Sequence, residues 1–300
     1  MIPGFLLGRL GRVSEKTVEG ITAILTDVAM PCLVFVKLLE TDPTLIGWFD
    51  LAVCAVFPVV LEILLFFICL PLFKLKGDGE AEVSRFCAIF SNCGFLGIPL
   101  AASLFPEEPR AVVLVSVFNV LSTFMLLTLG VYILSGDRKH ISVRRAIFKP
   151  ITAAILLGGV ALAFGLNEKL PFLGEYTGYL ADLTTPLSMT VLGVLFAKAC
   201  PKKLFARPSL YLASAVKLIA SPLISLLILA ALKFLLRLEI SASLAAAIFI
   251  SSGVSTAATA PAMAQTYQRD AQHATAITIL TTLLCMFTLP LLSLLFGLLF

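Results

Sequence analysis

The chain of 300 residues is 59% hydrophobic, carries charge at only 13% of positions and has a formal net charge of +4. An ordinary soluble domain carries charge at about 25% of positions, whereas the mean hydropathy here is +1.04. This composition excludes a soluble globular domain, a disordered chain, a coiled coil and a nucleic-acid-binding module. Most of the chain is expected to lie in lipid, in an all-α integral membrane fold.

Apolar runs separated by proline, glycine and charged residues predict nine full membrane-spanning helices. They cover residues 17–39, 47–73, 83–105, 111–134, 146–166, 178–197, 209–236, 242–267 and 271–300. Residues 1–10 predict a tenth helix, but ten residues extend only about 15 Å, half of a hydrocarbon core of roughly 30 Å. The first helix is therefore expected to be truncated, and a start site assigned too far downstream is the plain explanation.

The lysines and arginines predict the orientation of the chain. If both termini face outward, sixteen of the 22 basic residues fall in connections on the cytoplasmic side, which is the bias that cytoplasmic loops show. The basic linker at residues 138–149 then lies in the cytoplasm, with five helices before it and five after it. The expected location is the cell membrane.

An odd number of helices in each half predicts two inverted repeats, as in many secondary transporters. The first repeat is expected at residues 1–137 and the second at residues 150–300. Two features recur 155 residues apart, which supports the comparison of the halves. They are the spacing D-x-x-x-P at Asp27–Pro31 and Asp182–Pro186, and a charged residue at Glu62 and Lys217.

Two of the apolar runs contain helix-breaking residues near their middle. The sequences are SNCGFLGIPL, with Asn92, Gly94, Gly97 and Pro99, and SSGVSTAATAPAM, with Gly253, Ser255, Thr256 and Pro261. Proline and glycine disfavour a continuous helix, so each run is expected to break near mid-membrane.

Broken helices at matching places of inverted halves are typical of a substrate site at the membrane midplane. The N-terminus of the half-helix after each break offers free N–H groups and partial positive charge to an anion. The alternative is structural, because small residues also permit close packing of membrane helices. Seven cysteines without C-x-x-C spacing, and the histidines His140 and His273 in separate polar connections, predict no metal site and no cofactor.

The string N-x-G-F-x-G-x-P-L at residues 92–100 resembles the fourth-helix signature of the auxin efflux carrier family, which includes bacterial permeases and the plant PIN-FORMED proteins. Further similar segments are APAMAQTYQRD at 260–270 and LTTLLCMFTLP at 280–290. The resemblance spans the chain and implies ten helices in two inverted repeats, with helices four and nine crossing, and transport of small organic anions. It implies that Pro99 and Pro261 are the crossover prolines and that Asn92 meets a substrate carboxylate.

Four charged residues are expected at lipid depth, namely Asp27, Glu62, Asp182 and Lys217. Such residues are costly and usually face a cavity or the bundle interior, so they are candidates for ion coupling or substrate attraction. Glu62 and Lys217 could form a charge pair, or Lys217 could attract the anion while Glu62 takes a proton. The two aspartates, each one turn before a proline, are interpreted as acceptors for donors freed by a kink, and Asn119 as a packing residue.

The leading hypothesis is a secondary transporter of a small mono- or dicarboxylate, working by alternating access around the crossover. One alternative is a sodium-coupled symporter similar to the bile acid carriers, in which hydroxyl groups of residues 251–259 bind sodium. Another is a sensor that binds an organic anion without moving it. No catalytic motif occurs, so no enzyme is expected. The expected partners are the organic anion and the lipid bilayer, and no binding of nucleic acid is expected. The sequence allows a homodimer but does not predict one.

Overall fold

The computed structural model describes residues 2–40, 47–74, 79–106, 108–137, 139, 150–164, 171–198 and 207–299. The expected linker at 138–149 lies outside the described residues, apart from Lys139. The described chain is helical, and its extended pairing is a single antiparallel bridge between Ser91 and Thr256. The predicted all-α class is therefore confirmed.

Five of the described helices are long and apolar enough to cross a membrane. They are Lys16–Glu40, Trp48–Leu72, Pro109–Ser135, Pro208–Leu235 and Ala271–Leu299. Shorter apolar helices lie at Cys93–Leu104, Pro150–Leu162 and Ala242–Gly253. This set of spans has the composition of a multi-pass membrane protein, as expected from the sequence.

The elements include several five-residue π-helical turns, labelled η, which interrupt the longer helices. In chain order they are α1 (Ile2–Arg9), α2 (Glu15–Ile24), η1 (Leu25–Ala29), α3 (Met30–Glu40), α4 (Trp48–Leu72), α5 (Glu80–Ile89), η3 (Cys93–Gly97), α6 (Ile98–Leu104), α7 (Pro109–Met125), η4 (Leu126–Gly130), α8 (Val131–Ser135), α10 (Pro150–Ala163), α12 (Pro171–Ala181), α13 (Thr184–Lys198), α14 (Pro208–Ala215), η7 (Val216–Ala220), α15 (Ser221–Ala230), η8 (Ala231–Leu235), α16 (Ala242–Gly253), α17 (Ala260–Thr266) and α18 (Ala271–Leu299).

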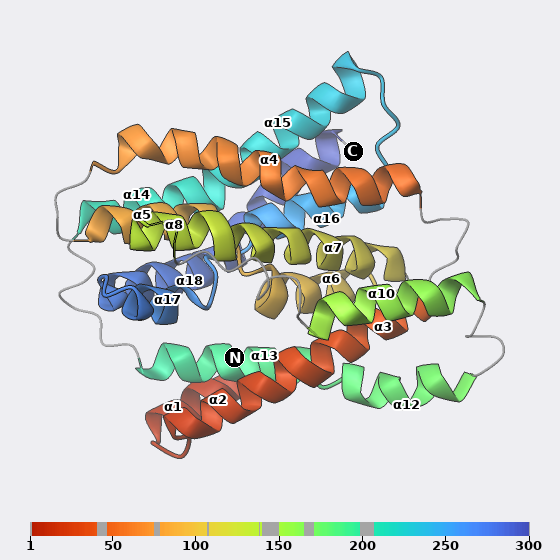
Figure 1. Cartoon of the computed structure of the whole chain (residues 1–300), viewed down its shortest axis with the longest axis horizontal. Helices are drawn as coiled ribbons and strands as arrows, with labels where there is room; N and C mark the ends of the chain where they lie inside the picture. Colours follow the sequence, from red (N-terminus) through yellow and green to blue (C-terminus); the bar gives the residue numbers. More distant parts are fainter. Residues whose placement is uncertain are drawn as a thin grey trace.

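The helices form two groups that each draw elements from both halves of the chain. In Figure 1, α1, α2, α3, α12 and α13 lie along the lower edge, with α10 beside α3. The larger group above them contains α4, α5, α7, α14, α15, α16 and α18. Helices α3 and α10 contact α7, and α13 contacts η3 and α6, so the groups meet around the first broken segment.

Helix α1 is short, as predicted, and packs closely along α13. A Cβ atom at Gly4 would lie 2.1 Å from the carbonyl oxygen of Thr190, and one at Gly8 would lie 2.6 Å from Cβ of Ala197. Only glycine permits backbones to approach this closely, which is how small residues serve membrane helix packing. The spacing of these two glycines therefore serves contact within the chain.

The two D-x-x-x-P sequences adopt different backbone structures. Before Pro31 the helix continues through the π-turn η1, whereas near Pro186 the chain turns at residues 182–183 between α12 and α13. Proline lacks an N–H and clashes with the carbonyl four residues earlier. The π-turn absorbs this conflict in the first case, and Pro186 escapes it by lying in the first turn of α13, where N–H groups need no helical partner. The prediction of one continuous helix over 178–197 is therefore wrong.

The predicted breaks in the other two runs are confirmed. Helix α5 ends at Ile89 before η3 begins at Cys93, and α16 ends at Gly253 before α17 begins at Ala260. The two breaks contact each other, because Asn92 N donates to Ser255 O at 2.8 Å and Ala257 N donates to Phe90 O at 3.0 Å. We call these facing segments, residues 90–92 and 254–259, the junction.

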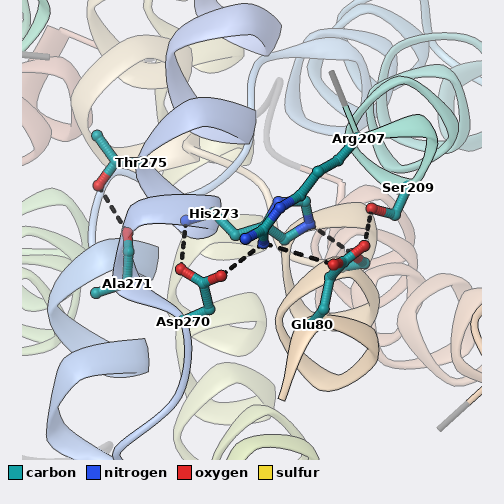
Figure 2. A network of polar contacts seen from close by, with 8 residues as sticks. Glu80, Arg207, Ser209, Asp270, Ala271, His273 and Thr275 are labelled. Carbon is teal, nitrogen blue, oxygen red and sulfur yellow. Dashed lines mark hydrogen bonds and ion pairs between the residues drawn. The ribbon is translucent and has the colours of Figure 1, made fainter. Parts of the chain in front are cut away.

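A polar network joins α5 to α14 and α18 (Figure 2). The Arg207 guanidinium lies 2.6 Å from Asp270 Oδ2 and 3.5 Å from Glu80 Oε2, and Ser209 Oγ also donates to Glu80. Partial burial would raise the pKa of Asp270, but hydrogen bonds from the His273 amide and Arg207 hold it below the ordinary aspartate value. His273 was expected in a polar connection, but it lies buried in the first turn of α18.

Candidate functional site

A cavity of about 350 Å³ lies against the junction. Its wall combines the lower group of helices with both broken segments. The lining residues are Thr22, Thr26, Asp27, Met30, Ser91, Asn92, Gly94, Phe95, Asn119, Thr123, Leu126, Leu127, Pro150, Ile151, Ala257, Ala258, Thr259 and Met263. A volume of this size suits a small organic molecule.

Asn92 is the most informative residue of this wall. Its side chain is only 3% exposed, yet its Nδ2 atom has no hydrogen-bond partner among the described residues. A buried amide without a partner is costly and calls for an explanation, which a bound ligand provides. Asn92 also precedes the helix Cys93–Leu104, whose first N–H groups lack helical partners. The wall thus offers hydrogen-bond donors together with the positive end of a helix.

Five other residues proposed for the site lie in the cavity wall or in the helices that follow the breaks. Gly94 and Asp27 line the cavity with Asn92, and the Asp27 carboxylate accepts a hydrogen bond from Thr26 Oγ1 at 3.0 Å, not from a backbone donor. Pro261 lies in the first turn of α17, at the start of the helix after the second break. Pro99 lies in the first turn of α6, where the π-turn η3 passes into the α-helix within Cys93–Leu104. Gly97 is buried at the end of η3, where a Cβ atom would lie 3.6 Å from side-chain atoms of Cys93 and Val115, and it does not line the cavity.

Ser255 and Thr256 are fully buried in the junction and do not line the cavity. Thr256 Oγ1 donates to Cys87 O at 2.7 Å, near the C-terminus of α5. Ser255 contributes its carbonyl oxygen to the bond with Asn92 N. Both residues therefore satisfy backbone groups that the broken helices leave open, and so position Asn92.

Lys217 is fully buried in η7 and lies against both broken segments. Its ammonium donates to Ser91 Oγ and to Ser252 O, the latter at 3.2 Å. The Ser252 carbonyl belongs to the last turn of α16, where the helix dipole is negative and a cation is stabilised.

Glu62, the other buried charge, accepts a hydrogen bond from Ser122 Oγ. The ion pairs between described residues do not include Glu62 with Lys217, so the two groups are not in direct contact, although the charge of each acts on the other. The lysine instead takes neutral oxygens as partners. Glu62 Oε2 has no hydrogen-bond partner among the described residues.

Asp182 lies away from the cavity. Its side chain is exposed at the turn between α12 and α13, beside a surface groove that also contains Lys37 and Glu40. The symmetry of the D-x-x-x-P spacing therefore does not extend to equivalent surroundings of the two aspartates.

Five polar residues of the wall were not proposed as site residues from the sequence: Thr22, Thr26, Ser91, Asn119 and Thr123. Asn119 was expected to pack, but its Oδ1 lies 3.5 Å from where a Cβ atom at Gly94 would be, so it faces the first break. Two of these residues could have been identified from the sequence. Asn119 is an amide within an apolar run, and Ser91 is next to Asn92. Thr123 gave no signal, because threonine is common in membrane helices.

Long apolar helices around a polar cavity at two joined helix breaks define a multi-pass membrane protein of the transporter class. A family model described as membrane transport protein matches residues 1–293. The chain therefore belongs to this family, the auxin efflux carrier family, as its motifs indicate. Membership of a transporter family points away from an enzyme.

Two relatives are also described as transporters, both uncharacterized. A protein of Methanothermobacter thermautotrophicus is 29% identical over 195 residues, covering 64% of this chain and 63% of the relative. One of Methanocaldococcus jannaschii is 28% identical over 203 residues, covering 65% of each. The chain thus spans slightly less than two thirds of the length of these relatives.

Proposed function

We propose that the protein is a secondary transporter that moves a small organic anion, a mono- or dicarboxylate, by alternating access around the junction. The observation that carries this proposal is the buried Asn92 amide, whose Nδ2 has no hydrogen-bond partner among the described residues and which lies in the wall of a cavity next to a helix N-terminus. A carboxylate would satisfy this donor and interact favourably with the helix dipole.

The proposed architecture is ten spans in two inverted repeats, at residues 1–137 and 150–300. In this arrangement α5–α6 and α16–α17 are the fourth and ninth spans, crossing at their breaks. The exchange of backbone hydrogen bonds between Asn92 and Ser255, and between Ala257 and Phe90, supports such a crossing. We further propose a cell membrane location with both termini outside, on the strength of the lysine and arginine bias.

With that orientation, the cavity lies on the cytoplasmic side of the junction. Thr22 lies in the first half of a span that starts on the cytoplasmic side. Leu127 and Met263 lie in the second halves of spans that start on the outer side, so all three residues are on the cytoplasmic side of the midplane. An apolar cluster of Leu25, Ala29 and Met30, with Phe95 and Leu187 against it, borders the cavity through Met30 and Phe95. In the proposed mechanism this cluster closes the path to the outer face. Movement of the lower group against the junction would open this cluster and expose the site alternately.

Flux through purified protein in liposomes tests the proposal. Labelled acetate, malonate, malate and indole-3-acetate are offered under an inward gradient, and at least one is expected to accumulate faster than in protein-free liposomes. N92A should reduce that flux. Binding of a carboxylate without flux would favour the sensor. The absence of both binding and flux across the whole panel would refute the proposal.

A further inference from the structure

Ser91 links the buried lysine to the cavity. Its hydroxyl oxygen accepts a hydrogen bond from Lys217 Nζ, and the residue lines the cavity directly beside Asn92. We propose that Ser91 contacts the substrate, donating a hydrogen bond to its carboxylate, and that Lys217 is a positioning residue that acts through this hydroxyl. The inference rests on the proposed function for the identity of the ligand as a carboxylate.

The chemistry of the two groups fixes the direction of the hydrogen bond. An ammonium has three hydrogens and no lone pair, whereas a hydroxyl has one hydrogen and two lone pairs. The contact with Lys217 therefore uses a lone pair of Ser91 and leaves its hydrogen for a second partner, which is the neighbouring Cys93 sulfur in the unliganded protein and would be the carboxylate when substrate is bound. Since Ser91 is half-buried and lines the cavity, that hydrogen can be donated to a group inside it.

The position of Lys217 makes the hydroxyl a stronger donor. The ammonium is fully buried, so water screens its charge little. A hydroxyl that accepts from a cation is polarised and donates more strongly to its next partner. The second bond of Lys217, to Ser252 O at 3.2 Å, anchors the ammonium so that it does not enter the cavity itself.

The other titratable groups near the ammonium have their own partners. The Cys93 thiol donates to Ser251 O at 3.2 Å, and Glu62 accepts from Ser122. Ser91 is therefore the side chain through which the lysine reaches the cavity wall. Ser91 and Asn92 thus place a hydroxyl and an amide, both hydrogen-bond donors, in the same cavity wall.

A cysteine at position 91 reports the influence of Lys217 without any substrate. In S91C, a nearby ammonium stabilises the thiolate, which is the reactive form. Labelling by the anionic reagent 2-sulfonatoethyl methanethiosulfonate is followed across pH, and mass spectrometry identifies the modified peptide. We expect S91C to react at a lower pH than T123C, which places a thiol on the same cavity wall away from the lysine.

Removing the lysine in S91C/K217M should slow labelling at neutral pH about tenfold, because one unit of thiol pKa changes the thiolate fraction tenfold. S91C/K217R keeps a cation and should restore the rate, which also covers the case in which the methionine variant fails to fold. Equal pH profiles for S91C, S91C/K217M and T123C would overturn the polarisation of position 91 by Lys217.

The substrate contact is tested by transport of labelled malonate, or by its competition with another transported acid. S91A should raise KM about tenfold with little change in kcat, and K217M should add less than twofold to S91A because both remove the same interaction. S221A is the matched control, since Ser221 also donates to Ser252 O but does not line the cavity.

Independent, multiplicative effects of S91A and K217M on KM would overturn the relay. A labelling difference combined with no carboxylate binding would retain the Lys217–Ser91 pair and reject the proposed function. Transport with an unchanged KM in S91A would retain the proposed function and reject Ser91 as a substrate contact. The two failures are therefore distinguishable.

Discussion

Replacing Asn92 by alanine separates affinity from stability. In the unliganded protein Nδ2 has no partner among the described residues, whereas a bound carboxylate would accept from it. A hydrogen bond to a charged group contributes about 1.5–3 kcal/mol. At 1.4 kcal/mol per factor of ten, the loss predicts an increase in Kd of about 10- to 150-fold.

The same substitution should leave the fold intact. It removes a buried donor whose desolvation is uncompensated, a cost of about 1–3 kcal/mol in the native state. The lost side-chain contacts offset this gain only in part, because Asn92 borders a cavity. The Tm of purified N92A in detergent is therefore expected to equal or slightly exceed that of the unmodified protein.

The assay measures Kd from the thermal shift with increasing carboxylate, since a ligand that binds the native state raises its Tm. S116A is the matched control, because buried Ser116 donates within its own helix to Val112 O at 2.7 Å and does not line the cavity. Unchanged affinity in N92A would refute the role of the amide. A fall in Tm in N92A would show that Nδ2 has a structural partner.

Other changes test the packing, the polar network and the coupling. G4L directs a side chain at Thr190 O, which lies 2.1 Å from the Cβ position, so overpacking of about 1–3 kcal/mol should lower Tm in a thermal melt. An unchanged Tm would place α1 elsewhere. D270N removes a carboxylate whose pKa is lowered in the folded state. That carboxylate stabilises fully above about pH 4 and loses its effect as pH falls through the folded pKa, so D270N should lower Tm at pH 7 and make acid unfolding shallower. The buried Lys217 ammonium already occupies Ser91 Oγ and Ser252 O, so replacing sodium by potassium should leave carboxylate flux unchanged, and a strict sodium requirement would favour the symporter.

The sequence predicted what depends on composition and on backbone chemistry. Long apolar runs gave the spans, and proline with glycine gave the breaks before Cys93 and before Ala260. Asn92 was recognisable because an amide among apolar residues requires a partner. These predictions rest on local rules, since an unsatisfied donor or a missing N–H has the same cost in any membrane fold.

The remaining features depend on three-dimensional packing and were not predictable in this way. The repeated D-x-x-x-P spacing suggested equivalent environments, but a π-turn absorbs one proline and a chain turn the other. The charges of Glu62 and Lys217 suggested a pair, yet the partner of the lysine is a serine next to the predicted site residue. Which neutral oxygen a buried cation contacts is set by helix rotation, for which neither periodicity nor charge gives a signal.

The hydrogen bonds of the junction support the proposal that the cavity binds an anion. The carbonyl groups near the end of α5 are satisfied by Thr256 Oγ1 and Ala257 N. The carbonyl of Ser252, near the end of α16, is satisfied by Lys217 and Ser221. The negative helix ends thus have donors from the protein, whereas the first N–H groups of Cys93–Leu104 lie beside the cavity. These N–H groups are donors at the positive end of a helix, so under the proposed function the complementary ligand is an acceptor with negative charge.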